Sequence, residues 1–317
     1  MSTSKKTTRL REFFTSPGTE VLPMGALPVH AQMAEAGGFG AFQISGAFSS
    51  WWLNGQPDVG LMTRTEVMDN ARRVVQSVDI PVYCDADTGF GGIQNVGRTV
   101  QEFIHAGIAG IHIEDQLEPK KAGGQAGIAI VSDEEAIGRL NAACEVRDKL
   151  DKDFVITART DAYAVAGGGL EEALRRGRLY REKTGADVIF YEGIRNREDW
   201  RYLLEQTPGP AYVIPSRHAG PTPPVAQLSE WGQAVQIFNF AVPSVQAVWK
   251  LLLKVRDSGE LAAYDQYIAE AFALEGTEEF VGFGDRFVKP TYQQVRELEE
   301  RFLPASLQRD YENSTHD

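Results

Sequence analysis

The 317-residue sequence predicts an α/β fold, a closed (β/α)8 barrel of the TIM type. Short apolar runs recur eight times along the chain, and each is followed by a stretch with helical spacing. Alternation of strand and helix predicts a parallel sheet, and eight copies indicate that the sheet closes on itself. Polar side chains gather where the runs end, which is where the chemistry of such a barrel lies. A doubly wound open sheet is the alternative architecture.

The predicted strands are short apolar segments that carry β-branched and aromatic residues. They cover residues 21–24, 41–45, 82–85, 110–114, 154–159, 188–192, 212–216 and 235–239. The predicted helices between and after them cover residues 29–36, 63–78, 95–106, 134–149, 170–184, 197–206, 224–231 and 245–258.

The sequence predicts a single domain over residues 1–317, because no linker or low-complexity segment interrupts it. The barrel is expected from about residue 12 to 258. A C-terminal helical segment at 259–304 has helical spacing over 264–273 and 291–304, and a polar tail follows at 305–317. The tail and the first ten or so residues are expected to be loosely ordered.

Composition and charge exclude several classes of function. The hydrophobic content of 43% and the charged content of 24% are those of an ordinary soluble protein. The net charge of −12 argues against nucleic-acid or anionic-membrane partners. Residues 1–11 lack the apolar core of a secretory signal, and no stretch is apolar over the length that spans a bilayer. Cys84 and Cys144 are expected to be buried, in a reducing, cytoplasmic setting.

Two acids follow the third predicted strand. Asp85 and Asp87 are two residues apart, so in an extended segment both side chains face the same spot. Convergent carboxylates repel each other unless a cation or a proton lies between them, and hard oxygen ligands suit magnesium or manganese. For this short motif alone, a solvated glycine-rich turn is the alternative.

The other predicted strands also end in polar or small residues. These are Ser45, Gly46 and Ala47 after the second, Glu114 after the fourth, Arg159 after the fifth, Glu192 after the sixth, Ser216, Arg217 and His218 after the seventh, and Asn239 after the eighth. Each alone is equally compatible with a helix cap or a salt bridge at the rim. Jointly, Asp85, Asp87 and Glu114 predict a divalent cation, because three uncompensated carboxylates would destabilise each other.

At these residues the chain resembles the isocitrate lyase and phosphoenolpyruvate mutase superfamily. The resembling segments appear in order between about residues 20 and 255: Ser45-Gly46, Pro57-Asp58-Val59-Gly60, Asp85-Ala86-Asp87-Thr88-Gly89-Phe90-Gly91, His112-Ile113-Glu114-Asp115-Gln116 and Ala158-Arg159-Thr160-Asp161. The chain looks most like the methylisocitrate lyase and 2,3-dimethylmalate lyase branch, because Pro119-Lys120-Lys121 follows the fourth of these segments.

The resemblance implies a magnesium-dependent carbon–carbon lyase, with manganese as a substitute ion, that acts through a pyruvate-type enolate. It implies a homotetramer in which one helix is exchanged between subunits. Metal ligands are expected at Asp85, Asp87 and Glu114. Catalytic roles are expected at Arg159, Asp58, Glu114 and Lys121. A small carboxylic acid is expected to bind at Ser45, Gly46, Ala47 and Arg159. From their positions at the ends of the sixth and seventh strands, and not from the resemblance, Glu192, Arg217 and His218 are candidates for further contacts with it.

The chain departs from the family's lyases in the loop after the fourth strand. That loop reads Lys120-Lys121-Ala122-Gly123-Gly124, whereas the lyases carry a cysteine that protonates the departing carbanion, followed by glycine and histidine. Cys84 does not replace this thiol, because it points away from the metal face of its strand. Gln43 and residues 215–218 also differ from the lyases. The Lys-Asn-Ser segment of the mutases is absent as well, which disfavours phosphoryl chemistry.

Three functions stay open. The first is a lyase that cleaves a C–C bond of a 2-hydroxy or 2-oxo di- or tricarboxylate, with Tyr163, His218 or a metal-ordered water as the acid. The second is a decarboxylase or hydrolase of an oxaloacetate-like acid, in which solvent protonates the enolate. The third is a non-catalytic carboxylate-binding protein, which the intact set of acids disfavours. Trp51 and Trp52 are expected to line either an apolar part of the substrate pocket or a subunit contact.

Overall fold

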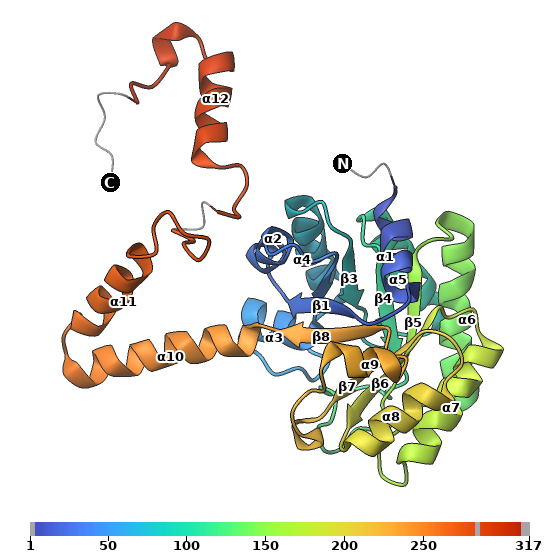
Figure 1. Ribbon diagram of the computed structural model, residues 1–317. Coiled ribbons are helices and arrows are strands. Elements are labelled where there is room, and N and C mark those ends of the chain that lie inside the picture. The colour runs from blue at the N-terminus through green and yellow to red at the C-terminus, as the bar shows by residue number, and fades with distance from the viewer. Residues whose placement is uncertain (1–3, 283–285, 312–317) are drawn as a thin grey trace. The chain divides into compact units, whose positions relative to one another are not determined.

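The computed structural model describes residues 4–282 and 286–311, and the chain divides into two compact units, Met1–Gln246 and Ala247–Asp317. The first unit contains eight parallel strands in the order β7-β6-β5-β4-β3-β2-β1-β8 (Figure 1). The sheet nearly closes where the Ala234 N–H, just before β8, donates to Ala211 O of β7 at 2.8 Å. The predicted TIM-type barrel is therefore confirmed.

Every predicted strand is present, with bounds that differ from the prediction by at most two residues. The strands are β1 Glu20–Gly25, β2 Phe42–Ile44, β3 Val82–Asp85, β4 Gly110–Glu114, β5 Val155–Thr160, β6 Val188–Ile194, β7 Ala211–Pro215 and β8 Val235–Asn239. The helices of the barrel are α1 Lys6–Thr15, α2 Pro28–Ala36, α3 Gly46–Asn54, α4 Arg64–Ser77, α5 Ile93–His105, α6 Asp133–Leu150, α7 Leu170–Lys183, α8 Arg197–Gln206, η1 Arg217–Ala219 and α9 Val225–Glu230.

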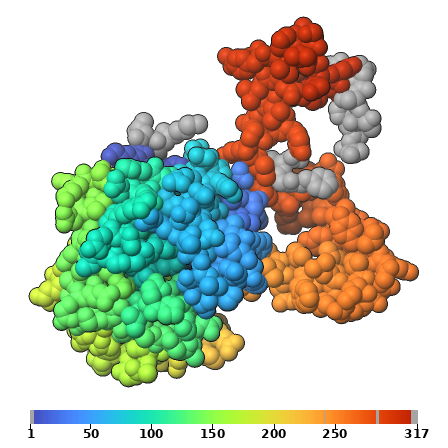
Figure 2. Space-filling model, turned by 180° about the vertical axis from the view of Figure 1, so that it is seen from behind, coloured from blue at the N-terminus to red at the C-terminus, as the bar shows by residue number. Residues whose placement is uncertain are grey.

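Alternate residues of each strand face two different cores, because successive side chains in a strand point to opposite faces. Cys84, Ile111 and Ile113 pack outward in the core that lies between the sheet and its helices. Tyr83 and Phe190 point into the barrel, where they belong to a smaller apolar cluster. In Figure 2 the blue-to-yellow part of the chain is one closely packed body. Both cysteines are free and buried, as predicted.

The expectation of a loosely ordered N-terminus is wrong for α1. Leu10 and Phe14 lie one helical turn apart, so both face the barrel, and both are buried in its interior cluster. The Phe14 ring meets the Tyr83 ring at 5.2 Å. Arg11 donates to the carbonyl of Phe154, immediately before β5. This helix therefore closes the amino-terminal end of the barrel.

The segment after β2 forms α3, a helix that the sequence pattern did not predict. Ser45 caps it, because its Oγ accepts the Phe48 N–H at 3.3 Å, and Gly55 ends it in a left-handed conformation with φ of 63°. The helix consequently begins at the carboxyl end of β2 and presents its first N–H groups to the barrel rim.

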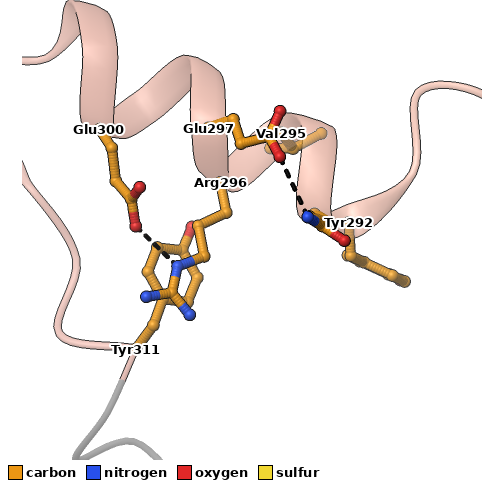
Figure 3. A pocket seen from close by; sticks show the side chains of 7 residues that line it. Tyr292, Val295, Arg296, Glu297, Glu300 and Tyr311 are labelled. Atoms are coloured by element: carbon orange, nitrogen blue, oxygen red, sulfur yellow. Dashed lines mark hydrogen bonds and ion pairs between the residues drawn. The ribbon is translucent and has the colours of Figure 1, made fainter.

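The second unit contains most of α10 Ala241–Ser258, and α11 Ala262–Phe272, α12 Tyr292–Phe302 and η2 Ala305–Leu307. None of the described residues of α11 or α12 is buried. A cavity of about 560 Å³ lies between α12 and the segment around Tyr311, where Arg296 stacks on the Tyr311 ring and pairs with Glu300 (Figure 3). Across the described chain, no helix combines the length and apolarity that crossing a membrane requires.

Candidate active site

Strand register brings the first charged pairs of the site together. Asp85 of β3 lies opposite His112 of β4, and Glu114 of β4 lies opposite Arg159 of β5. Asp85 Oδ1 is consequently 3.0 Å from His112 Nε2, and Glu114 Oε2 is 3.0 Å from Arg159 Nη1. All four side chains are buried at the carboxyl end of the barrel, where βα-loops assemble a catalytic face.

Asp87 joins this group through a strained turn. Its φ of 46° lies in the left-handed region, which non-glycine residues seldom adopt and which often marks functional positions. Its N–H donates to Asp85 Oδ1 at 2.9 Å, and its carbonyl accepts the Glu114 N–H at 2.9 Å. These bonds return the chain to the rim, so that the Asp87 carboxylate is buried beside Asp85.

Lys120 provides the main cation for Asp87. Its Nζ lies 2.6 Å from Asp87 Oδ1 and also contacts Asp58 Oδ1, and its side chain is buried. Its N–H donates to Glu118 Oε2 at 2.9 Å, and Glu118 Oε1 accepts the Thr88 hydroxyl. The loop after β4 is thereby fastened to the turn after β3 by charge and by hydrogen bonds.

One guanidinium is shared among three carboxylates. Arg159 Nε and Nη2 donate to Asp161 in a bidentate pair, at 3.0 Å each. Glu114 Oε2 lies 3.0 Å from Nη1, and Glu192 of β6 lies farther away, with its Oε2 3.8 Å from Nη2. The guanidinium carbon lies 5.2 Å from the centre of the Phe190 ring. Arg159 is therefore fixed from several sides.

The pKa values of the acids diverge although all are buried. Burial raises the pKa of Asp85, but His112, Lys120 and Arg159 outweigh burial and hold that pKa well below its usual range. Burial raises the pKa of Glu114 well above its usual range against the opposing effect of Arg159. Burial likewise raises the pKa of Glu192 to about 7. The rim therefore cannot carry a negative charge on every carboxyl group.

The amino end of α3 supplies N–H donors next to these acids. The Gly46 N–H donates to Asp85 Oδ2 at 3.1 Å. A side chain at position 46 would collide, because a Cβ there would lie 2.8 Å from Asp85 Oδ2 and 3.2 Å from Asp87 Oδ1. Ser45 caps the helix, and the Ala47 N–H belongs to its unpaired first turn. The predicted carboxylate-binding residues thus lie at a helix N-terminus, which favours anions.

The loop that follows β4 lies over the site. The Ala122 N–H donates to Asp58 O at 2.9 Å, and the backbone of Lys121 is paired with the Gln116 side chain. A Cβ added to Gly123 would lie only 2.3 Å from Glu192 Cγ, so Gly123 rests directly on the Glu192 side chain. The described conformation is therefore closed, and Ala122 occupies the position of the missing thiol.

The remaining predicted residues lie outside this cluster. Arg217 and His218 are exposed in η1, where Arg217 Nε is 3.4 Å from His218 Nε2. The Tyr163 hydroxyl donates to Asp199 Oδ2 at 2.5 Å. Trp51 is 44% exposed. It helps to line a cavity of about 420 Å³ between α3 and the loop, together with Ala47, Phe48, Gly55, Gln56, Pro57, Asp58 and Ala122.

Sequence reasoning missed several buried members of the site. His112 precedes Glu114 by two residues and so faces the same side of β4, which is a signal that could have identified it. Lys120, rather than the predicted Lys121, reaches the acids. Asp161 clamps Arg159. Sequence reasoning also treated the acids as uncompensated, whereas Lys120 and Arg159 supply positive charge beside them.

Magnesium fits the acids in donor chemistry and charge. Glu114 Oε1 is buried without a hydrogen-bond donor, and Asp85 and Asp87 add further carboxylate oxygens, the ligands that magnesium prefers. In the part of the chain that the structure describes, these groups do not converge as a finished ligand set, because Lys120 pairs with Asp87 and Arg159 with Glu114. A bound ion would therefore compete with Lys120 for Asp87.

Comparison with known sequences gives two informative relatives. The chain is 39% identical to 2,3-dimethylmalate lyase of Eubacterium barkeri over 236 residues, which are 74% of this chain and 79% of that protein. It is 37% identical to 2-methylisocitrate lyase of Shewanella oneidensis over 209 residues, which are 66% of this chain and 65% of that protein. Both relatives are carbon–carbon lyases.

Solved structures extend the comparison to other reactions. Oxaloacetate acetylhydrolase in complex with 3,3-difluorooxalacetate has a TM-score of 0.76 and 29% identity, covering 86% of this chain and 98% of that one. Phosphonopyruvate hydrolase in complex with oxalate and Mg²⁺ has a TM-score of 0.76 and 28% identity, covering 95% of this chain and all of that one. These relatives bind small carboxylates.

The family model for phosphoenolpyruvate phosphomutase matches residues 11–255. This match spans all eight strands of the barrel and every acid of the site. Together with the two lyase relatives, it shows that the chain belongs to the phosphoenolpyruvate mutase and isocitrate lyase superfamily, whose members are C–C lyases and hydrolases that act on carboxylic acids.

Proposed function

We propose that the protein is a magnesium-dependent lyase that cleaves a C–C bond of a 2-hydroxy or 2-oxo di- or tricarboxylate through an enolate. The observation that carries this proposal is the buried rim in which Asp85, Asp87 and Glu114 face Arg159 and the amino end of α3. Such a rim offers acids for a metal and donors for a carboxylate within one closed space. Manganese is the expected substitute ion.

Binding of the substrate is assigned to α3 and Arg159. The free N–H of Ala47, the Ser45 hydroxyl and the helix dipole favour the 2-oxo or 2-hydroxy carboxylate. Arg159 is held by Asp161 and Phe190, so it keeps its orientation as a substrate approaches and remains protonated at any working pH. Asp58 and Lys120 close the loop over the bound acid and exclude water.

A bound magnesium ion would be held by Asp85, Asp87 and Glu114, and it would supply Lewis-acid stabilisation of the negative charge that develops on the substrate. Arg159 stabilises the same charge from the β5 side, 3.0 Å from Glu114. The catalytic assignment of Lys121 and the substrate-binding assignments of Arg217 and His218 depend on the loops after β4 and β7. The exposed η1 would have to turn inward for the latter two.

A second candidate function is decarboxylation or hydrolysis of an oxaloacetate-like 2-oxo acid. Two observations favour it: Ala122 offers no proton from the closed loop, and a structural neighbour is an oxaloacetate acetylhydrolase. In this reaction the enolate needs stabilisation by the same rim, so the binding assignments stay the same. Non-catalytic carboxylate binding has no comparable support, because Arg159 and the three acids are intact.

Assembly into a homotetramer with an exchanged helix is part of the proposal. It is supported by the described residues of α11 and α12, none of which is buried although large apolar side chains such as Tyr267 and Phe302 are present. Unpartnered apolar surface of this kind indicates a protein contact. The free, buried cysteines support a reducing, cytoplasmic setting.

A substrate screen tests the proposal. The protein is incubated with Mg²⁺ and a panel of 2-hydroxy and 2-oxo di- and tricarboxylates, and products are identified by mass spectrometry. Pyruvate or glyoxylate plus a second acid supports the lyase, whereas carbon dioxide or two acids formed by water addition support the second candidate. Asp85→Asn should abolish turnover without unfolding, while Glu145→Gln, an exposed acid on α6, should not. Absence of product from every acid in the panel, or turnover that persists in the presence of a metal chelator, would contradict the proposal.

A further inference from the structure

We propose that Glu192 is the general acid of this site, the group that delivers a proton to the carbon left negative when the substrate bond breaks. The inference rests on the proposed function and deepens it, because it supplies the proton donor that the lyase reaction needs in place of the missing thiol. It is carried by the position of Glu192 at the end of β6, by its weak ion pairing and by the loop that covers it.

Ion pairing singles out Glu192 among the acids around Arg159. Asp161 takes two guanidinium N–H groups at 3.0 Å and Glu114 takes another nitrogen at 3.0 Å, whereas Glu192 is held only at 3.8 Å. One positive charge cannot neutralise three buried carboxylates, and Glu192 is the one that lies farthest from the guanidinium. The negative charges of Asp161, just after β5, and of Asp85 in β3 raise its pKa further.

Access to Glu192 is restricted but not blocked. Its side chain is 12% exposed, and Gly123 of the closed loop rests on it, so closely that a Cβ at position 123 would lie 2.5 Å from Glu192 Oε1. Removal of water by the loop protects a carbanion from random protonation, so the proton must come from a group inside the closed site. Glu192 therefore combines a retained proton with a position at the rim.

The other acids considered from sequence are engaged elsewhere. The Tyr163 hydroxyl is committed to Asp199, and burial raises its pKa to about 12. His218 is exposed in η1. Cys84 and Cys144 are buried in the outer core, away from the barrel interior. Burial also raises the pKa of Glu114, but Glu114 is assigned to the metal, so Glu192 is the rim acid that is left for proton transfer.

The proposed proton transfer accounts for every bond that breaks and forms. As the C–C bond breaks, its electron pair stays on the carbon beside a carboxylate or carbonyl group. The Glu192 O–H bond then breaks, its proton forms the new C–H bond, and Glu192 remains as a carboxylate. In the lyase reaction the hydroxyl proton of the 2-hydroxy acid passes to an ionised carboxylate of the rim as C=O forms, and it reaches solvent when the loop opens. Glu192 regains a proton from water after the loop opens, and no oxidant or reductant is required.

The test uses Glu192→Gln and Glu192→Asp, with Glu230→Gln on exposed α9 as the matched control. Turnover is measured in D₂O on the substrate that the screen identifies, and oxalate binding with Mg²⁺ is measured by calorimetry. Glu192→Gln should lose about 100- to 10,000-fold in kcat, while its oxalate affinity changes less than about threefold. Glu192→Asp should recover part of the rate.

Deuterium incorporation separates proton donation from a structural role. On a substrate whose carbanion carbon bears a substituent, the native protein and the control should place deuterium on one face of that carbon, whereas residual product from Glu192→Gln should be racemic, because solvent reaches either face. Full turnover with unchanged stereochemistry in Glu192→Gln, or loss of turnover in proportion to oxalate affinity, would overturn the inference alone. Absence of turnover in the native protein on every acid tested would overturn the proposed function and the inference with it.

Discussion

Replacing Gly46 with alanine should separate activity from folding. Gly46 opens α3, and a Cβ there would lie 2.8 Å from Asp85 Oδ2, 3.1 Å from Asp85 Cγ and 3.2 Å from Asp87 Oδ1. Ordinary contact begins near 3.5 Å, so the Asp85 carboxylate must retreat by roughly 0.7 Å. It is tied to His112 at 3.0 Å, and this pair must therefore shift with it.

Gly46→Ala is expected to lower catalytic activity rather than stability. Displacement of a metal-binding carboxylate by somewhat under an ångström should lower kcat/KM by about 100-fold. Alanine is a better helix former than glycine by about 1 kcal/mol, which offsets part of the local strain. The midpoint of thermal unfolding should consequently stay within about 4 °C of the native value. Steady-state kinetics and differential scanning calorimetry on the same preparations measure the two quantities.

Gly97→Ala is the matched control. Gly97 also lies in a helix, α5, but its added Cβ would meet only Val146 Cγ2 at an ordinary 3.5 Å. This variant should gain about 1 kcal/mol of stability with unchanged kinetics. Full activity in Gly46→Ala would refute the assigned role of the Asp85 carboxylate. A large drop in its unfolding midpoint would instead show that the clash disturbs the core.

The same structure supports three further predictions. Phe14→Ala should lower the free energy of unfolding in urea by about 3–5 kcal/mol and leave kcat unchanged, because Phe14 packs at the end of the barrel opposite the site. An unchanged unfolding midpoint would contradict the role of α1 in closing that end. Tyr180→Phe removes the hydroxyl that donates to Asp115 Oδ2 at 2.7 Å and should lower the free energy of unfolding by about 1–3 kcal/mol. Urea unfolding measures this loss, and unchanged stability would show that the hydrogen bond is dispensable. Trp51→Ala should raise KM only for acids with an apolar substituent, whereas a changed sedimentation coefficient would instead identify Trp51 as a subunit contact.

The fold was predictable because its signal is repeated. Eight apolar runs with intervening helices leave few alternatives, and the family model and the strand order confirm both the fold class and the superfamily. The errors lie where the signal is local. The helix α1 carries only Leu10 and Phe14 as buried apolar anchors within a polar, basic segment. The helix α3 is apolar nearly all round, so it shows no amphipathic pattern, although Ser45 and Gly55 mark its ends.

The site was predictable only in part. Register along parallel strands brings Asp85, Glu114 and Arg159 to one rim, and that consequence follows from sequence. The choice between Lys120 and Lys121 does not, because loop geometry decides which of two adjacent side chains turns inward. How closely Arg159 pairs with each of its acids depends on N···O distances that differ by less than an ångström, and the spacing of residues in a sequence cannot predict such differences. The roles of these residues therefore stay predictions.

Calorimetric titration of the protein with Mn²⁺, and in parallel with Mg²⁺, tests the central claim most directly. We predict one ion per chain, with an affinity that falls at least about tenfold in Glu114→Gln and is unchanged in the exposed control Glu145→Gln. Failure to bind either ion, or equal affinity in the native protein and Glu114→Gln, would contradict the assignment of these carboxylates to a metal.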